Sequence, residues 1–121
     1  MGKCILVVED QADNRQILRD LLTFSGFEIV EVTDGAQALG AITTRRPDLI
    51  LMDIQLPVMD GYEATRRIKG GPATKDIPII VVTSYALSGD EAKARAAGSD
   101  DYVAKPFSPR ALLTKIREYL D

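Results

Sequence analysis

The sequence predicts an α/β fold in which a parallel sheet is covered by helices on both faces. Short apolar runs of strand length alternate five times with amphipathic stretches of helix length along the 121 residues. Three of these runs are apolar almost throughout, as is typical of strands that are buried on both faces. Alternation of strand and helix within one domain of this size indicates a doubly wound parallel sheet.

Five strands are expected, at Ile5–Val8, Glu28–Val32, Leu49–Met52, Ile77–Val82 and Asp101–Val103. The second strand carries Glu28 and Glu31 among its apolar residues and therefore suits an edge of the sheet, whereas the first, third and fourth suit its centre. No linker, low-complexity segment or internal repeat interrupts the pattern. We expect one domain over residues 1–121, without an output domain.

Each expected helix has a start signal. Pairs with the spacing of a capping box are Asp13 with Gln16, Asp34 with Gln37, Asp60 with Glu63, and Ser88 with Glu91. Ser108 precedes a proline at the first position of the last helix. Apolar residues recur at helical spacing in the first and last helices, at Ile17, Leu18, Leu21 and Leu22 and at Leu112, Leu113, Ile116 and Leu120.

The helix after Ser88 differs from the others because the segment DEAKARAAG offers only alanines for its apolar face. Such a helix buries little surface and should be the most loosely held element of the fold. Two interpretations stay open: an ordinary surface helix, or an element that shifts in response to an event nearby.

Composition excludes several classes of function. The net charge of −3 argues against nucleic-acid binding through a basic face. No apolar run approaches the roughly 18 residues that a membrane span needs. The single cysteine, Cys4, suits a buried position in a protein of the reducing cytoplasm. The absence of histidine removes Ser-His-Asp and Cys-His catalysis and leaves carboxylates, hydroxyls and amines for any chemistry.

Polar side chains follow the carboxyl ends of four expected strands. They are Glu9 and Asp10 after the first strand, Asp53 after the third, Thr83 and Ser84 after the fourth, and Lys105 after the fifth. Open α/β sheets bind ligands beyond this edge, where the strand order reverses. We therefore expect these six residues to converge although they are far apart in the sequence.

Three carboxylates in one crevice repel one another, by about 4 kcal/mol for a pair about 4 Å apart at an effective dielectric of about 20. Lys105 or a bound cation would offset this repulsion, and a ligand set made only of oxygen favours Mg²⁺. A carboxylate beside a divalent metal, a hydroxyl and an ammonium suits phosphoryl transfer. Asp53 is the best candidate nucleophile because it directly follows a buried strand.

Four segments resemble the receiver domains of two-component response regulators, in order and at the spacing of that family: VVED, LILMDIQLPVMDG, IIVVTS and AAGSDDYVAKPFSP. The resemblance covers the whole chain and is closest in kind to the chemotaxis-regulator-like, single-domain type. It implies a flavodoxin-like fold with strand order 2-1-3-4-5. Its C-terminal part, SDDYVAKPFSPRALL, is also similar to DNA-binding regulators, whereas MDIQLPVMDGYEATRRIK is more similar to single-domain regulators and to receivers of hybrid kinases. The branch of the family therefore stays open.

The resemblance implies a role for Asp53 as acceptor of a phosphoryl group from a histidine kinase or a histidine phosphotransfer protein. Asp10 and Asp53 would bind Mg²⁺, with Mn²⁺ as an alternative, together with the backbone carbonyl of Gln55, while Glu9 would act through water. Thr83 and Lys105 would contact the phosphoryl group.

The resemblance also implies a switch and a binding face. Tyr102 would turn inward as Thr83 moves toward the phosphate, and the peptide bond between Lys105 and Pro106 would be cis. The output would be binding to a downstream protein through the face of the fourth helix, fifth strand and fifth helix. Such a protein would be a cytoplasmic monomer or weak homodimer without direct contact to nucleic acid or membrane.

Two other functions fit parts of the pattern less well. A magnesium-dependent phosphatase that passes through an aspartyl phosphate usually has a second aspartate two residues after the nucleophile, and Gln55 occupies that position. A flavin binder would place an anionic phosphate against three acidic residues. The favoured interpretation is a signalling switch that catalyses only its own phosphotransfer and slow autodephosphorylation.

We predict that the aspartyl phosphate is long-lived. Gln55 and Tyr85 lie two residues beyond Asp53 and Thr83 and would flank the path of a hydrolytic water. Because Tyr85 is bulky, it should impede that water, so Tyr85→Ala should accelerate loss of the phosphoryl group, followed by mass spectrometry. An unchanged rate would mean that Tyr85 points to solvent instead.

Overall fold

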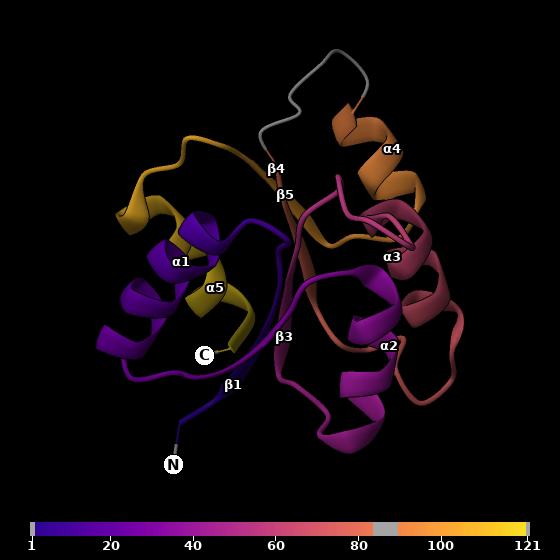
Figure 1. Cartoon of the computed structure of the whole chain (residues 1–121), viewed down its shortest axis with the longest axis horizontal. Helices are drawn as coiled ribbons and strands as arrows, with labels where there is room; N and C mark the ends of the chain where they lie inside the picture. Colours follow the sequence, from indigo (N-terminus) through magenta and orange to yellow (C-terminus); the bar gives the residue numbers. More distant parts are fainter. Residues whose placement is uncertain (1, 84–89, 121) are drawn as a thin grey trace.

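The computed structural model describes residues 2–83 and 90–120. Its five parallel strands form one sheet in the order β2-β1-β3-β4-β5 (Figure 1), which confirms the predicted flavodoxin-like, doubly wound topology. The strands are β1 (Cys4–Val8), β2 (Glu28–Val32), β3 (Leu49–Met52), β4 (Ile79–Thr83) and β5 (Asp101–Ala104). β2 lies at an edge of the sheet, as its two glutamates predict.

The fourth strand begins two residues later than the sequence suggests. Pro78 has no N–H to donate to a neighbouring strand, although its carbonyl still accepts a hydrogen bond from Ile50 N at 2.9 Å. Regular pairing therefore starts at Ile79 and continues one residue further than expected, to Thr83.

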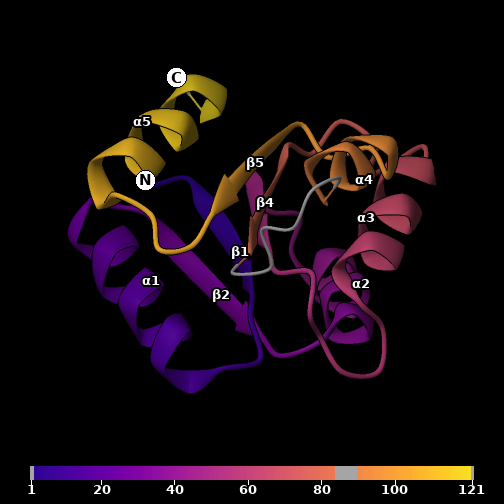
Figure 2. The same ribbon diagram turned by 90° about the horizontal axis from the view of Figure 1, so that it is seen from above.

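Five helices cover the sheet in two groups. They are α1 (Ala12–Phe24), α2 (Gly35–Thr44), α3 (Gly61–Gly70), α4 (Asp90–Ala96) and α5 (Pro109–Leu120). α1 and α5 lie on one face, and α2, α3 and α4 lie on the other (Figures 1 and 2). No helix within the described ranges has the length and apolar character needed to cross a bilayer.

The two faces of the sheet bury separate clusters, because successive residues of a strand point to opposite sides. In β1, Ile5 and Val7 join the cluster beneath α1 and α5, whereas Leu6 and Val8 join the cluster beneath α2 and α3. Cys4, at the start of the same strand, is buried as expected. The central strands are therefore fixed from both sides.

The predicted helix starts are mostly confirmed. The carboxylate of Asp34 accepts a hydrogen bond from Gln37 N at 2.8 Å, and that of Asp60 accepts one from Glu63 N at 2.9 Å. The hydroxyl of Ser108 accepts a hydrogen bond from Ala111 N at 3.3 Å. Ser88 lies outside the described residues.

The predicted cap at Asp13 is wrong. α1 begins earlier, at Ala12, and its N-cap is Gln11, whose side chain makes no capping hydrogen bond. Asp13 lies in the first turn, where a carboxylate is favoured by the helix dipole without acting as a cap.

Ile17 departs from the predicted apolar face of α1. Its neighbours Leu18 and Leu22 are buried against the sheet, but Ile17 is 56% exposed. One residue corresponds to about 100° of rotation around a helix, which turns Ile17 from the sheet toward the segment that joins β5 to α5.

α4 buries little, in agreement with its alanine-rich sequence. Ala94 is fully buried, whereas the other residues of this helix whose burial is described are exposed. Ala94 packs with Ile54 and Val81, and Tyr62 and Tyr102 lie partly buried against this small cluster. Among the described residues of α4, the apolar contact with the sheet is therefore small, and Arg95 adds an ion pair with Asp101 of β5 at 3.8 Å.

Lys69 joins three segments near the end of α3. Its ammonium lies 2.7 Å from Asp100 Oδ2 and donates to the carbonyls of Ile77 and Lys75 at 2.7 and 3.2 Å. Asp100 Oδ2 also accepts a hydrogen bond from Ile79 N at 2.8 Å. This half-buried ammonium, with three donors used, fixes the chain before β4 and before β5.

We predict that Lys69→Met lowers the free energy of unfolding by about 2 kcal/mol, because it leaves Asp100 and two carbonyls without their charged partner. Lys75→Met is the matched control, since the side chain of Lys75 is exposed in the same segment. Urea unfolding measures both variants, and equal losses would contradict this role for Lys69.

Candidate functional site

The sheet brings the predicted site residues to one edge. Glu9 N donates to Val32 O, Asp53 N to Val8 O, and Lys105 N to Thr83 O, at 3.1, 3.0 and 2.8 Å. Each of these residues directly follows its strand, and its backbone N–H still bonds to a neighbouring strand. The directions in which their side chains leave the sheet are therefore set by the register of the strands.

Three carboxylates converge there as expected. Oxygen atoms of Glu9, Asp10 and Asp53 lie within 4.8 Å of one another. Glu9 is 2% exposed and Asp53 is 8% exposed, while Asp10 faces solvent. A cluster of carboxylate oxygens with one open side fits a hard divalent cation such as Mg²⁺, which keeps part of its water shell when it binds to proteins.

The ammonium of Lys105 lies against two of these carboxylates. It forms a short ion pair with Glu9 Oε1, and its Nζ atom is 3.5 Å from Asp53 Oδ2. The other oxygen of Asp53, Oδ1, accepts a hydrogen bond from Ile54 N at 2.7 Å. Lys105 therefore offsets the repulsion of the two buried acids, and Asp53 is held by one oxygen while the other faces the lysine.

Burial changes the acidity of Glu9. Loss of water raises the pKa of this carboxyl, the hydrogen bond from Lys105 lowers it in part, and the nearby charge of Asp53 raises it again, with a net rise. Ionisation of Glu9 therefore lowers the stability of the folded chain relative to the unfolded chain.

Four of the remaining predicted residues, Thr83, Tyr102, Pro106 and Gln55, are described by the structure, and two are not. Thr83 is fully buried at the end of β4, and Tyr102 is half-buried in β5 within the small cluster beneath α4. The bond between Lys105 and Pro106 is cis, as the resemblance implies. Gln55 is exposed, and its carbonyl as a metal ligand stays a prediction. Ser84 and Tyr85 lie outside the described residues.

Gly61 is a site residue that the sequence analysis missed. A Cβ atom at this position would lie 2.0 Å from the carbonyl oxygen of Asp53, and Gly61 N donates to Ile54 O at 2.9 Å. Only glycine lets α3 start this close to the backbone that carries Asp53. The available signal was the glycine directly after Asp60, the cap of this helix.

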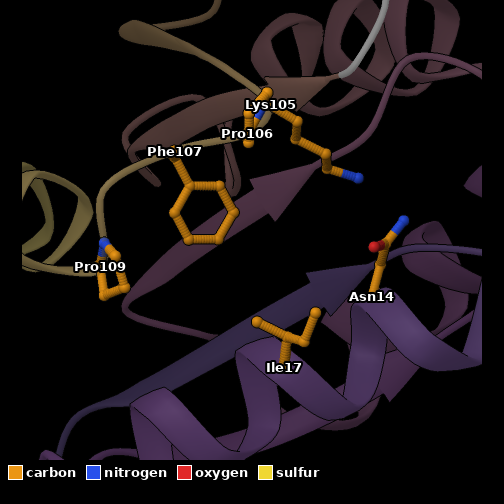
Figure 3. A pocket seen from close by; sticks show the side chains of 6 residues that line it. All are labelled: Asn14, Ile17, Lys105, Pro106, Phe107 and Pro109. Atoms are coloured by element: carbon orange, nitrogen blue, oxygen red, sulfur yellow. The ribbon is translucent and has the colours of Figure 1, made fainter.

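An apolar hollow adjoins the acidic cluster. It has a volume of about 310 Å³ and lies between α1 and the segment from β5 to α5 (Figure 3). Lys105 belongs to both features, since its stem lines the hollow while its ammonium meets the carboxylates. The lining residues are Asn14, Ile17, Lys105, Pro106, Phe107 and Pro109.

Comparison with known proteins agrees with this geometry. The sequence model of one protein family, the response regulator receiver domain, matches residues 5–117 of this chain. The chain belongs to this family. The polar-differentiation response regulator DivK of Brucella anthropi is 41% identical to this receiver domain over 120 residues, which are 99% of this chain and 98% of that protein.

Solved receiver domains have the same fold. One of them is the receiver domain of sensor histidine kinase PA1611 from Pseudomonas aeruginosa, with a TM-score of 0.92 and 39% identity over 99% of this chain and 98% of that one. That structure is described with a magnesium ion coordinated in its active-site cleft. A protein from Chloroflexus aurantiacus, described as a response regulator, has a TM-score of 0.95 and 31% identity with the same coverage. This receiver domain is therefore a component of two-component signalling.

We predict that the stability of Glu9→Gln relative to the wild type rises with pH in the metal-free receiver domain. Because the pKa of Glu9 is raised in the folded state, the unfolded chain ionises this carboxyl first as the pH passes its ordinary value of 4.5. The wild type then loses stability until folded Glu9 is ionised as well, whereas the variant does not. The stability of the variant relative to the wild type should rise from about pH 4 to about pH 8.

Urea unfolding with a chelator present measures this difference at both ends of the range. Glu118→Gln, which changes an exposed carboxyl on α5, is the control. A stability difference between Glu9→Gln and the wild type that is the same at both pH values would contradict the prediction.

Proposed function

We propose that Asp53 of this receiver domain accepts a phosphoryl group from a phosphohistidine of a kinase or phosphotransfer protein, and that phosphorylation switches a protein-binding face. The observation that carries the proposal is the position of Lys105 Nζ, which lies against both Glu9 and Asp53 at the carboxyl edge of the sheet. A cation at this place neutralises a buried acid before the reaction and phosphoryl oxygens after it.

Asp53 Oδ2 is the oxygen best placed to attack. Oδ1 is occupied by Ile54 N, whereas Oδ2 faces the ammonium of Lys105. In the proposed step Oδ2 forms a bond to phosphorus while the bond from phosphorus to the imidazole nitrogen of the donor breaks, and the departing imidazole takes a proton from solvent. Thr83, buried at the end of β4, supplies a hydroxyl for a phosphoryl oxygen.

Glu9, Asp10 and Asp53 are the side chains that would hold Mg²⁺, together with the carbonyl of Gln55. When bound, the ion supplies positive charge that neutralises the carboxylates and the transferred phosphoryl oxygens. The carboxylate cluster and the magnesium described in the similar PA1611 receiver domain support this assignment.

Contacts between the site and α4 support a switch. Ile54, which follows Asp53, packs with Ala94 of α4, and Tyr102 of β5 lies against the same cluster. Movement of Thr83 toward a phosphoryl group would change the space available to Tyr102. Because α4 buries little, a small change of free energy in this cluster can shift it between two positions.

The proposal includes two protein surfaces. The hollow beside Lys105 gives the phosphodonor protein an apolar surface next to the acceptor. A downstream protein would bind the face of α4, β5 and α5, with the receiver acting in the cytoplasm as a monomer or weak homodimer. Function without an output domain is supported by the Brucella regulator, since the alignment with it spans 98% of that protein.

Intact-mass spectrometry after incubation with Mg²⁺ and acetyl phosphate tests the acceptor. We expect addition of a single phosphoryl group in the wild type and in Asp13→Asn, which changes an exposed acid at the same edge, and no addition in Asp53→Asn. Equal phosphorylation of Asp53→Asn would contradict the proposal, since the phosphoryl group would then be on another residue.

A further inference from the structure

Arg15 on α1 contacts the backbone of the acidic segment. Its Nη1 atom donates a hydrogen bond to the carbonyl oxygen of Glu9 at 3.0 Å, and its Nε atom lies 3.7 Å from Glu31 Oε1 on β2. The side chain is 19% exposed. One guanidinium therefore joins the start of the Glu9–Asp10 segment to both α1 and the edge strand.

This contact adds to the restraints on Glu9, whose carboxylate already pairs with Lys105. Glu9 N is held by Val32 O, but the chain then leaves the sheet and enters α1 at Gln11, whose side chain forms no capping hydrogen bond. Gln11 N donates to Glu9 Oε2 at a longer distance of 3.3 Å. The hydrogen bond from Arg15 holds the peptide between Glu9 and Asp10, and so restrains the backbone from which both carboxylate side chains extend.

The charge of Arg15 is compensated at the same place. Glu31 lies near Arg15 and also accepts two hydrogen bonds from Arg19, at 2.7 and 2.9 Å. Arg15 and Arg19 share this partner and lie one turn apart on α1, but the bond to the Glu9 carbonyl is made by Arg15. A positive charge beside an acidic cluster would by itself repel a cation, and the carboxylate of Glu31 offsets that repulsion.

We propose that Arg15 is a positioning residue for the divalent-cation site, which acts by holding the peptide that joins two of its three carboxylates. The inference rests on the proposed metal-binding function of Glu9, Asp10 and Asp53. Residues that orient metal ligands without touching the metal commonly change its affinity by about tenfold or more. Arg15 should therefore affect cation binding more than it affects stability.

The test is binding of Mn²⁺ alone to the full chain, with free Mn²⁺ measured by electron paramagnetic resonance. We expect about tenfold weaker binding in Arg15→Ala. Arg19→Ala is the matched control, because it also removes an ion pair with Glu31 from the same helix, and its affinity should equal that of the wild type. Arg15→Lys retains a cationic donor for the Glu9 carbonyl and should recover most of the affinity.

Urea unfolding without metal provides the second readout. Arg15→Ala and Arg19→Ala should lose similar, small amounts of stability, while only the former loses Mn²⁺ affinity. Unchanged or tighter Mn²⁺ binding by Arg15→Ala would overturn the inference, as would an equal loss in both variants. A wild type that fails to bind Mn²⁺ would instead contradict the proposed metal site and, with it, this inference.

Discussion

Glu9 and Asp53 are buried carboxylates at the ends of neighbouring strands, and the ammonium of Lys105 lies against both of them. Two buried acids this close would be expensive without a cation, because water cannot screen their repulsion. The lysine provides that cation from the far side of the site, since it follows β5 while the acids follow β1 and β3. The sheet must therefore hold three strand ends in register for the charges to balance, and the continued backbone hydrogen bonds of these residues do so.

The same arrangement supports the proposed switch. A charge balance that depends on one lysine changes when a divalent cation or a phosphoryl group is added. In the proposed switch, the consequences would pass first to Ile54, which follows Asp53, and to Thr83 at the end of β4. They would then pass to Tyr102 and to α4, whose Ala94 packs with Ile54 and Val81. Lys69 and Asp100 fix the chain just beyond the C-terminal end of α4.

Much of this molecule could be predicted from its sequence, because parallel strands with apolar runs leave few alternatives. The residues after β1, β3 and β5, and Thr83 at the end of β4, had to meet at one edge once the topology was known. Features that depend on contacts between distant segments were not predictable. Ile17 is turned toward the segment after β5 by its position around α1, and α1 itself starts before Asp13. The contact of Arg15 with the Glu9 carbonyl exists only when α1 packs beside β1 and β2. The need for glycine at position 61 likewise arises from the closeness of α3 to Asp53.

We propose that the carboxylates balanced by Lys105 form a single site for a divalent cation. Anomalous diffraction from a crystal soaked in Mn²⁺ would test it most directly, because it locates the metal without assumptions about ligands. We expect one strong anomalous peak among the carboxylates of Glu9, Asp10 and Asp53. A peak elsewhere on the surface, or no peak at a concentration that saturates similar receiver domains, would contradict it.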